Sequence, residues 1–174
     1  MTAVLIRRGV KADVPLIASS WLKAFRAGPA VECVPNTLYF RAQHRMLEQV
    51  IPGSILLVAC NEEDPNQILG WCCAIVAQGA LILHFMYVKG TFRGFGIARK
   101  MFDTLKEIYI SEADRPYPGF FFYTHRVRVN KITTKKYGAI YNPYLLWANI
   151  GDTEYVPQSD SERQPPNQHP GSEE

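Results

Sequence analysis

The first part of the chain combines a short apolar run with stretches in which apolar residues recur every three or four positions. The run 4–8 has the length and composition of a β-strand. Asp13 is expected to cap the N-terminus of a helix that has Pro15 in its first turn and ends at Gly28-Pro29. Apolar residues at helical spacing predict a second helix over 36–50. The pattern therefore predicts one strand followed by two helices.

Three strands and a further helix are predicted next. The apolar runs 54–60, 68–77 and 80–88 are bounded by turn residues, and Gln78-Gly79 between the last two predicts a tight hairpin. The segment 97–110 repeats apolar residues at helical spacing and leaves its charged residues on the other face. The expected order is three antiparallel strands and then a helix.

The last third of the chain is less regular. The very apolar run 120–124 predicts a short strand in the interior of a sheet. A basic segment, 125–136, precedes Gly138, which is expected to end a helix, and 143–150 is predicted to be the last strand. From 156 to 174 the chain is mostly Pro, Ser, Gln, Asp and Glu, so this stretch is predicted to be a disordered polar tail.

Length and charge add a domain organisation to this pattern. The 174 residues fit one domain, which we expect to occupy 1–155. The formal net charge is +3, although 156–174 carries four acidic residues against one arginine. The basic excess of the expected domain suits an anionic cofactor or substrate. It is less concentrated than a dedicated nucleic-acid binder requires.

The cysteines and the apolar runs bear on location and on metals. Cys60, Cys72 and Cys73 lie in predicted strands, and the four cysteines of the chain show no metal-ligand spacing, so we expect buried free thiols and no metal site. No apolar run has the length of a membrane-spanning helix, and the first residues lack the features of a signal peptide. The expected location is a reducing cytoplasm, without membrane attachment.

A glycine-rich turn joins the strand 80–88 to the helix 97–110. Its sequence is Arg93-Gly94-Phe95-Gly96-Ile97-Ala98. Glycines let a backbone approach a ligand closely, and a helix N-terminus offers unpaired N–H groups and a partial positive charge. Together these features predict a pyrophosphate site. The alternative is a tight strand-to-helix connection that holds no ligand.

This turn also carries a family resemblance. Arg93-x-x-Gly96-x-Ala98, after a strand that ends in Tyr87-Val88, resembles the acetyl-CoA motif of the GNAT acyltransferases. The order of predicted elements over 1–150 is similar to that family as well. The resemblance implies an α/β (α+β) GNAT fold, with a mixed central sheet of about six to seven strands, about four flanking helices and a splayed strand pair that binds CoA.

The resemblance also implies acetyl-CoA as co-substrate and a set of residues that contact it. In the family the turn amides hold the CoA pyrophosphate, and the preceding strand pairs its backbone with the pantetheine arm. A later family pattern begins at an asparagine, which here is Asn130. The implied CoA-binding residues are Met86, Tyr87, Val88, Arg93, Gly94, Phe95, Gly96, Ile97, Ala98 and Asn130.

The proton acceptor of the reaction is not where many family members have it. Acyl transfer to an amine needs a neutral amine and stabilisation of the carbonyl oxygen, and the departing thiolate benefits from a proton. The strand 80–88 contains no Asp or Glu, and His84 is its only side chain that titrates near neutrality. His125, at the end of the next strand, is a second candidate. Glu32 lies after the first predicted helix, where the resemblance implies residues that recognise the acceptor, or it is simply an exposed loop carboxylate. Each histidine has an alternative interpretation as an ordinary structural residue.

The proton donor also departs from the family pattern. Family members place a tyrosine four residues before the glycine that matches Gly138, and this chain has Thr134 there. Tyr137 and Tyr141 lie close enough to replace it, with Tyr137 preferred. Both could instead pack at the rim of a hydrophobic core.

Two classes of function remain open from the sequence. The first is a CoA-dependent N-acyltransferase, transferring acetyl to a primary amine by direct attack in a ternary complex. The second is a GNAT-like protein that binds or modifies nucleic acid through the basic surface 126–136, which is followed by aromatic residues. The bland interpretation of that surface is a solvated helix face. A homodimer is left open.

Overall fold

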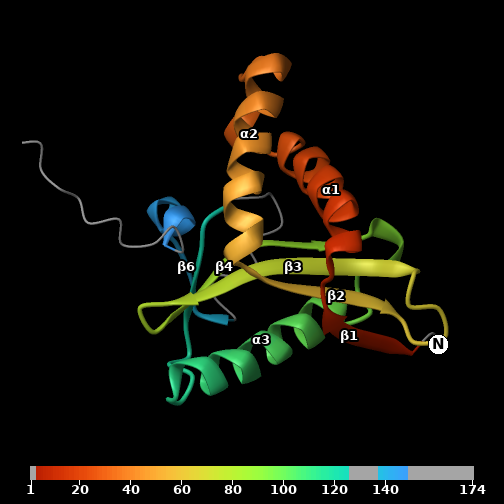
Figure 1. The fold of residues 1–174 in the computed structure, drawn as a ribbon, viewed down its shortest axis with the longest axis vertical. Helices are drawn as coiled ribbons and strands as arrows, with labels where there is room; N and C mark the ends of the chain where they lie inside the picture. Colours follow the sequence, from red (N-terminus) through yellow and green to blue (C-terminus); the bar gives the residue numbers. More distant parts are fainter. Residues whose placement is uncertain (1–2, 126–136, 149–174) are drawn as a thin grey trace, which may run out of the picture.

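The computed structural model of the protein describes residues 3–125 and 137–148. They form a six-stranded mixed sheet whose strands follow their sequence order from β1 to β6. Helices α1 and α2 cover one face of this sheet and α3 covers the other (Figure 1). The main elements are β1 (Val4–Arg8), α1 (Val14–Arg26), α2 (Asn36–Val50), β2 (Ile55–Asn61), β3 (Ile68–Ala77), β4 (Ala80–Val88), α3 (Ile97–Ala113), β5 (Phe121–Tyr123) and β6 (Ala139–Tyr141).

The sheet changes from antiparallel to parallel at β4. Strands β1 to β4 pair antiparallel with their neighbours, whereas β5 pairs in parallel with β4 and β6 in parallel with β5. The β3–β4 hairpin turns at Gln78 and Gly79, whose φ angles of 49° and 69° are both left-handed. Two left-handed central residues make a hairpin turn whose twist matches that of the flanking strands. The turn therefore fixes the register of β4, which carries several candidate residues.

Strand β4 contains a bulge at His84. Phe85 lies opposite Cys73 and Leu83 lies opposite Ala74, so His84 is an extra residue with no partner on β3. An extra residue bends the strand and re-aims the side chains around it. The bulge lies one residue beyond the last rung shared with β5, between Leu83 and Tyr123.

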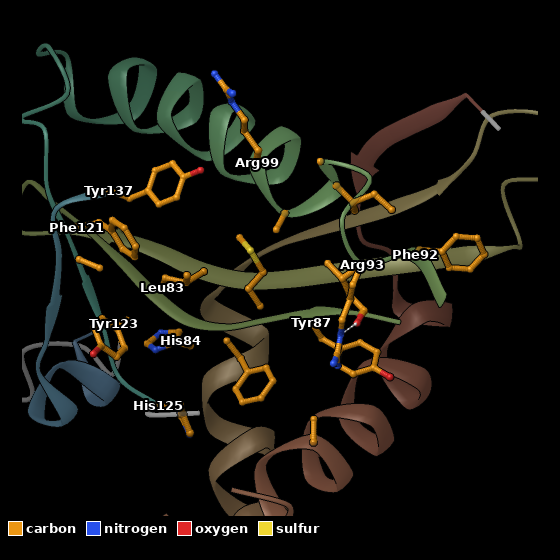
Figure 2. A pocket seen from close by; sticks show the side chains of 18 of the residues that line it. Leu83, His84, Tyr87, Phe92, Arg93, Arg99, Phe121, Tyr123, His125 and Tyr137 are labelled. Carbon is orange, nitrogen blue, oxygen red and sulfur yellow. Dashed lines mark hydrogen bonds between the residues drawn. The ribbon is translucent and has the colours of Figure 1, made fainter. Parts of the chain in front are cut away.

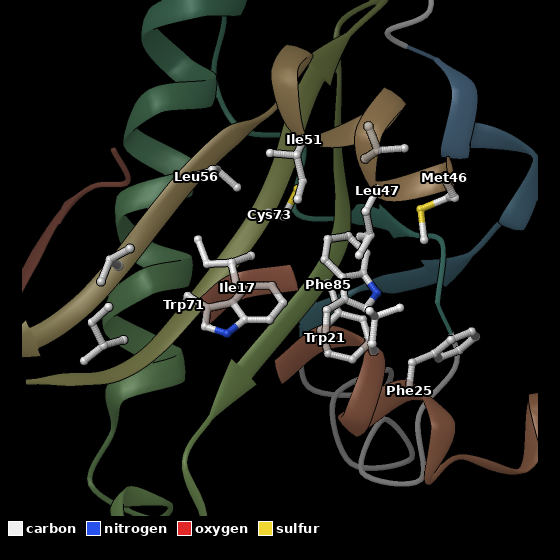
Figure 3. Packing of buried hydrophobic residues seen from close by; sticks show 14 of the residues in the cluster. Ile17, Trp21, Phe25, Met46, Leu47, Ile51, Leu56, Trp71, Cys73 and Phe85 are labelled. Atoms are coloured by element: carbon white, nitrogen blue, oxygen red, sulfur yellow. The ribbon is translucent and has the colours of Figure 1, made fainter. Parts of the chain in front are cut away.

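A layer of aromatic side chains packs between the sheet and the helices α1 and α2. Trp21 of α1 stacks on Phe85 at 5.0 Å between ring centroids, and Phe85 stacks on Trp71 of β3 at 5.6 Å. Figure 3 shows Ile17 beside them, with Leu47 of α2 completing the layer. Because Trp21 and Trp71 are almost fully buried, this layer holds α1 firmly over the end of β4.

The opposite face of the sheet is covered by one stripe of α3. Met101, Leu105 and Tyr109 recur every four residues and are buried against the sheet. Lys106 and Glu107 lie on the outer side of the same helix. The amphipathic pattern in the sequence is therefore the contact surface, and it fixes the position of the helix N-terminus beside β4.

Several sequence predictions are confirmed and two are wrong. The predicted strand 4–8, helix 36–50, strands 68–77 and 80–88 and the hairpin turn have the predicted bounds, and 120–124 contains the interior strand β5. Asp13 lies at the start of α1, but its side chain makes no capping bond to that helix. It instead accepts two hydrogen bonds from the Arg7 guanidinium, at 2.7 and 2.9 Å, and one from the Val10 amide at 2.8 Å.

The predicted last strand over 143–150 is the second error. The strand β6 lies earlier, and Pro143–Trp147 forms a 3-10 helix. Pro143 has no N–H to give to a sheet, and its fixed φ suits the first turn of a helix. The Asn142 side chain accepts a hydrogen bond from the Tyr144 amide at 3.1 Å, which caps this helix. Apolar composition alone had suggested a strand.

Other predictions fall partly outside the described residues. The basic segment 126–136, with Asn130, Thr134 and the expected fourth helix, lies outside them, and so does the tail 156–174. Within the described ranges, Cys60, Cys72 and Cys73 are buried free thiols as predicted, and Cys33 is exposed. No helix in the same ranges has both the length and the apolar character for crossing a membrane. No group of three potential metal ligands occurs in 3–125 or 137–148.

Candidate functional site

A cavity of about 730 Å³ opens where β4 and β5 separate. In the described part of the chain the two strands pair only at Ile82–Phe122 and Leu83–Tyr123. Beyond that rung the edge of β4 that faces β5 has no strand partner among the described residues, and the cavity follows it from His84 to Val88. Backbone groups on such an open edge can hydrogen-bond an extended ligand. The expected splayed strand pair is therefore present.

The glycine-rich turn forms one end of this cavity. Gly94 and Gly96 have φ angles of 89° and 77°, which glycine adopts without strain. A Cβ built on either residue meets no atom within 4 Å, so the space above the turn is open. Helix α3 begins directly after Gly96 and spans 17 residues. Its first N–H groups and partial positive charge are thus presented beside the cavity.

Two arginines add positive charge at this end. The Arg93 Nε donates a hydrogen bond to the Val88 carbonyl at 3.1 Å, which ties the turn to the end of β4. Arg99, in the first turn of α3, also lines the cavity. Figure 2 shows Arg93 and Tyr87 towards one end of the cavity and His84 towards the other. An anion bound at the turn would therefore meet backbone amides, with Arg93 and Arg99 as nearby cations, and the Arg99 Nε lies 3.8 Å from the Asp103 carboxylate on the same helix.

The predicted CoA-binding residues mostly lie together. Met86, Tyr87 and Val88 line the cavity on β4, and five of the six turn residues line it as well: Arg93, Gly94, Gly96, Ile97 and Ala98. The exception is Phe95, whose side chain is 63% exposed and is not among the lining residues. Asn130 lies outside the described residues.

The two candidate histidines lie next to each other, joined by a threonine. The His84 Nδ1 is 3.3 Å from the Thr124 hydroxyl oxygen, and the His125 Nδ1 is 2.9 Å from the same oxygen. His84 and His125 are only 1% and 8% exposed, yet both line the cavity. Parallel pairing of β4 with β5 produces this arrangement, because it sets Thr124 beside His84 directly after the last rung.

Burial keeps both imidazoles neutral at physiological pH. Desolvation lowers the pKa of His84 to about 4. Desolvation, together with the neighbouring His84, lowers the pKa of His125 to about 4. The His125 ring also packs edge-on against Phe25 and Trp21, at centroid distances of 4.8 and 5.2 Å. Each histidine is therefore available as a neutral hydrogen-bonding group.

The candidate tyrosines occupy different positions. Tyr137 lines the cavity, and its ring contacts Phe102 of α3 at 5.8 Å between centroids. Tyr141 lies on β6, where its ring contacts Tyr123 at 5.3 Å, and it is not among the lining residues. Glu32 is exposed and does not line the cavity either. Of these three, only Tyr137 lies at the cavity wall.

Sequence patterns missed several residues that line the cavity or contact its histidines. Arg99 could have been noticed as a second cation in the first turn of the predicted helix. Thr124 carried no signal, because a single threonine at a strand end is common. Ala24, Ala27 and Gly28 at the end of α1 also line the cavity. They were hidden because small residues at a helix end do not by themselves indicate a cavity.

Comparisons with known proteins place the fold. No known sequence family matches the chain, and no curated protein matches it. Among solved structures, a protein assigned as an acetyl transferase from Pyrococcus furiosus superposes with a TM-score of 0.57 at 17% identity, over 78% of this chain and 90% of that one. The chain has the GNAT fold. A Corynebacterium glutamicum protein, described as histone acetyltransferase HPA2 and related acetyltransferase, gives a TM-score of 0.50 at 16% identity, over 65% and 72% of the two chains.

The predicted fold class is confirmed. The GNAT fold here has six strands in a mixed sheet and three α-helices within the described residues. The glycine-rich turn, predicted from the sequence, and the open edge of β4, implied by the family resemblance, line the same cavity in this fold. With identities below one fifth, these likenesses establish the fold, and the chemistry has to be argued from the site itself.

Proposed function

We propose that this protein is a CoA-dependent N-acyltransferase that transfers acetyl from acetyl-CoA to a primary amine in a ternary complex. One observation carries the proposal. A single cavity joins the glycine turn at the start of α3 to the unpaired edge of β4. A turn that can bind pyrophosphate lies beside a strand edge that can bind an extended amide chain, and CoA contains both groups in that order.

The CoA would be held at three places. The pyrophosphate would lie on the amides that follow Gly94 and Gly96, with Arg93 and Arg99 supplying charge-assisted hydrogen bonds. The amides of the pantetheine arm would pair with the backbone of β4 over 86–88. The thioester would then reach towards His84, where β4 and β5 begin to separate. Asn130 stays a proposed contact of the same cofactor.

In the proposed reaction the amine nitrogen attacks the thioester carbonyl carbon. A C–N bond forms, the C–S bond breaks, and the amine proton has to leave the nitrogen while the departing sulfur takes up a proton. His84 and His125 are the proposed proton acceptors, since both line the cavity. Tyr137 is the proposed proton donor to the sulfur, and Tyr141 is the second choice for this role.

The domain bounds, the location and the oligomeric state stay proposals. The domain is taken as 1–155 and the polar tail as 156–174. Location in the cytoplasm and homodimerisation are open to direct measurement. Nothing in the described residues favours the nucleic-acid alternative, whose basic surface lies in 126–136.

The first test is binding and turnover with the unmodified protein. We expect acetyl-CoA to raise the melting temperature and to give a saturable calorimetric isotherm, because a ligand that binds only the folded state stabilises it. ATP is the matched control, as it carries phosphates but no pantetheine arm, and it should bind more weakly. A panel of primary amines, followed by free-thiol release, should then identify an acceptor. Absence of acetyl-CoA binding would remove the basis of the proposal.

A second expected result concerns the proton donor. Tyr137→Phe should lower kcat roughly tenfold, which is below the usual range for a general acid because a CoA thiolate leaves readily. The KM for acetyl-CoA should change little. Tyr141→Phe is the comparison variant and should have the smaller effect, because Tyr141 does not line the cavity. Equal losses in the two variants would speak against a specific role for Tyr137.

A further inference from the structure

Three buried polar side chains form a continuous hydrogen-bonded chain at the apex of the splayed strands. The Thr124 hydroxyl lies between the Nδ1 atoms of His84 and His125, at 3.3 and 2.9 Å. All three residues are at most 8% exposed. His84 lies on the bulge of β4, and the other two directly follow β5. The chain therefore bridges the two strands whose separation creates the cavity.

Counting protons restricts the tautomers of the two histidines. Burial keeps both rings neutral, so each carries one N–H and one bare nitrogen. The Thr124 hydroxyl has one proton to donate. It has the His84 carbonyl as another acceptor, but at 3.5 Å that contact is at the limit of a hydrogen bond, whereas His125 Nδ1 at 2.9 Å is well within range. A donation to one imidazole requires the other to donate its Nδ1–H to Thr124.

The lengths of the two contacts favour one direction for the chain. A hydroxyl donor suits the shorter contact, so in the arrangement proposed below Thr124 donates to His125 Nδ1 and the His84 Nδ1–H donates to Thr124. His84 Nε2 then carries a lone pair and no proton. That nitrogen has no hydrogen-bond partner among the described residues. A buried lone pair without a partner is cheaper than a buried N–H without one, which agrees with this tautomer.

We propose that His84, Thr124 and His125 form one proton-handling unit, in which Thr124 is a positioning residue that holds the two imidazoles in opposite tautomers and His84 Nε2 receives the proton of the attacking amine. This deepens the proposed function and rests on it. The unit differs from two separate candidate bases, because the threonine makes the basicity of one ring depend on the other.

The proton transfers balance without any additional reagent. As the C–N bond forms, the amine nitrogen becomes positively charged and gives its proton to His84 Nε2. The His84 Nδ1 proton can move towards the Thr124 oxygen while the hydroxyl proton moves to His125 Nδ1, so both rings share one positive charge. When the C–S bond breaks, Tyr137 gives its proton to the thiolate, and the transfers in the unit reverse to return the amine proton to Tyr137. The products are the amide and free CoA, and the unit returns to its first state.

A weakly basic unit is sufficient for this step. An alkylammonium ion holds its proton far more tightly than an imidazole does, so the amine has to arrive neutral. The nitrogen becomes more acidic as it attacks the carbonyl, and it is a strong acid once the C–S bond breaks and an N-protonated amide forms, so transfer to a buried imidazole becomes downhill as the reaction proceeds. The aromatic surroundings of His125 keep water away, which favours transfer within the chain.

Nitrogen-15 NMR of the histidine rings tests the hydrogen-bonded unit without any substrate. The chain has four histidines, and His→Gln variants assign the signals. We expect His84 in the Nδ1–H form and His125 in the Nε2–H form at pH 7. Thr124→Val should move His84 away from the Nδ1–H form, whereas Thr124→Ser should keep it. Identical tautomers in the unmodified protein, or no response to Thr124→Val, would overturn the proposal.

Kinetics test the role of the unit in acyl transfer. Once an acceptor amine is known, Thr124→Val should lower kcat by about 10- to 100-fold with little change in the KM for acetyl-CoA. Thr124→Ser should restore most of the rate. In a His84→Gln background the same Thr124→Val change should have little further effect, because the two residues act together. His44→Gln, on the exposed face of α2, is the control.

The outcomes separate the two proposals. If NMR showed opposite tautomers for His84 and His125 but the protein did not bind acetyl-CoA, the hydrogen-bonded unit would stand and the proposed acyltransferase function would be refuted. If the protein turned over acetyl-CoA and Thr124→Val lowered kcat as much in the His84→Gln background as in the unmodified protein, the acyltransferase function would stand and the unit would be refuted. Melting temperatures of all variants establish that they are folded under the assay conditions.

Discussion

Gly96→Val is expected to abolish acetyl-CoA binding, with affinity at least about 100-fold lower, while the protein remains folded. Gly96 precedes the first residue of α3 and lines the cavity, and the space in front of its Cα is open. The valine methyl groups would fill that space and hold phosphate oxygens away from the amides at the helix start. Close approach of backbone and phosphate is what the glycine provides.

The same substitution has a predictable cost to stability. The φ of Gly96 is 77°, a left-handed value that a β-branched residue adopts with a strain of about 1–2 kcal/mol. No atom lies within 4 Å of the new Cβ, so no clash adds to this strain. A melting temperature a few degrees lower is expected, and calorimetry well below it separates lost binding from lost folding.

Gly90→Val provides the matched control. Gly90 is also open around its Cα, but it does not line the cavity. The Gly90→Val variant should bind acetyl-CoA with the same affinity as the unmodified protein. If Gly96→Val bound acetyl-CoA with unchanged affinity, the pyrophosphate would have to lie elsewhere, and the main support for the proposed function would be lost.

Acid is expected to destabilise the protein between about pH 6.5 and pH 4. Burial lowers the pKa of His84 and of His125 to about 4 in the folded protein, whereas the ordinary value is 6.5. Between these values the unfolded chain binds more protons than the folded one, so stability falls as the pH is lowered. Above pH 6.5 both histidines are neutral in the folded and in the unfolded protein, so their contribution to stability is complete. The loss for each histidine is up to roughly 3 kcal/mol.

Urea unfolding at a series of pH values between 7.5 and 4.5 measures this effect. His125→Phe should make the dependence shallower and leave the part due to His84, because a phenyl ring keeps the contacts with Phe25 and Trp21 and cannot take up a proton. His44→Gln, at an exposed position, should leave it unchanged. A stability that does not vary over this range would mean that the two histidines are not buried as neutral groups.

A second acid-sensitive contact acts in a different range. The Arg7 guanidinium holds the pKa of Asp13 below its ordinary value of 3.8. A carboxylate with a lowered pKa contributes its stability above that ordinary value and loses it as the pH falls further. Its loss therefore begins where the loss from the histidines ends, and unfolding between pH 6.5 and 4 reports mainly on His84 and His125.

The sequence was most informative where local physics is strong. The helix 36–50 and the strands 68–77 and 80–88 have the predicted bounds, because periodic apolar residues and clear turn residues agree there. The last strand was misplaced, because Pro143 and the capping side chain of Asn142 outweigh the apolar character of the residues after them. The side-chain role of Asp13 was also missed, since its partner Arg7 comes from β1.

What the sequence determined by itself was the glycine-rich turn and the strand before it. Both depend on residues adjacent in the chain, so their geometry follows from glycine φ angles and strand periodicity. The tertiary structure alone decided that His84 and His125 belong to one unit. Their contact through Thr124 depends on the parallel register of two strands that lie about 40 residues apart, together with a bulge in one of them. No local pattern encodes such a register, because it results from how the whole sheet packs between its helices.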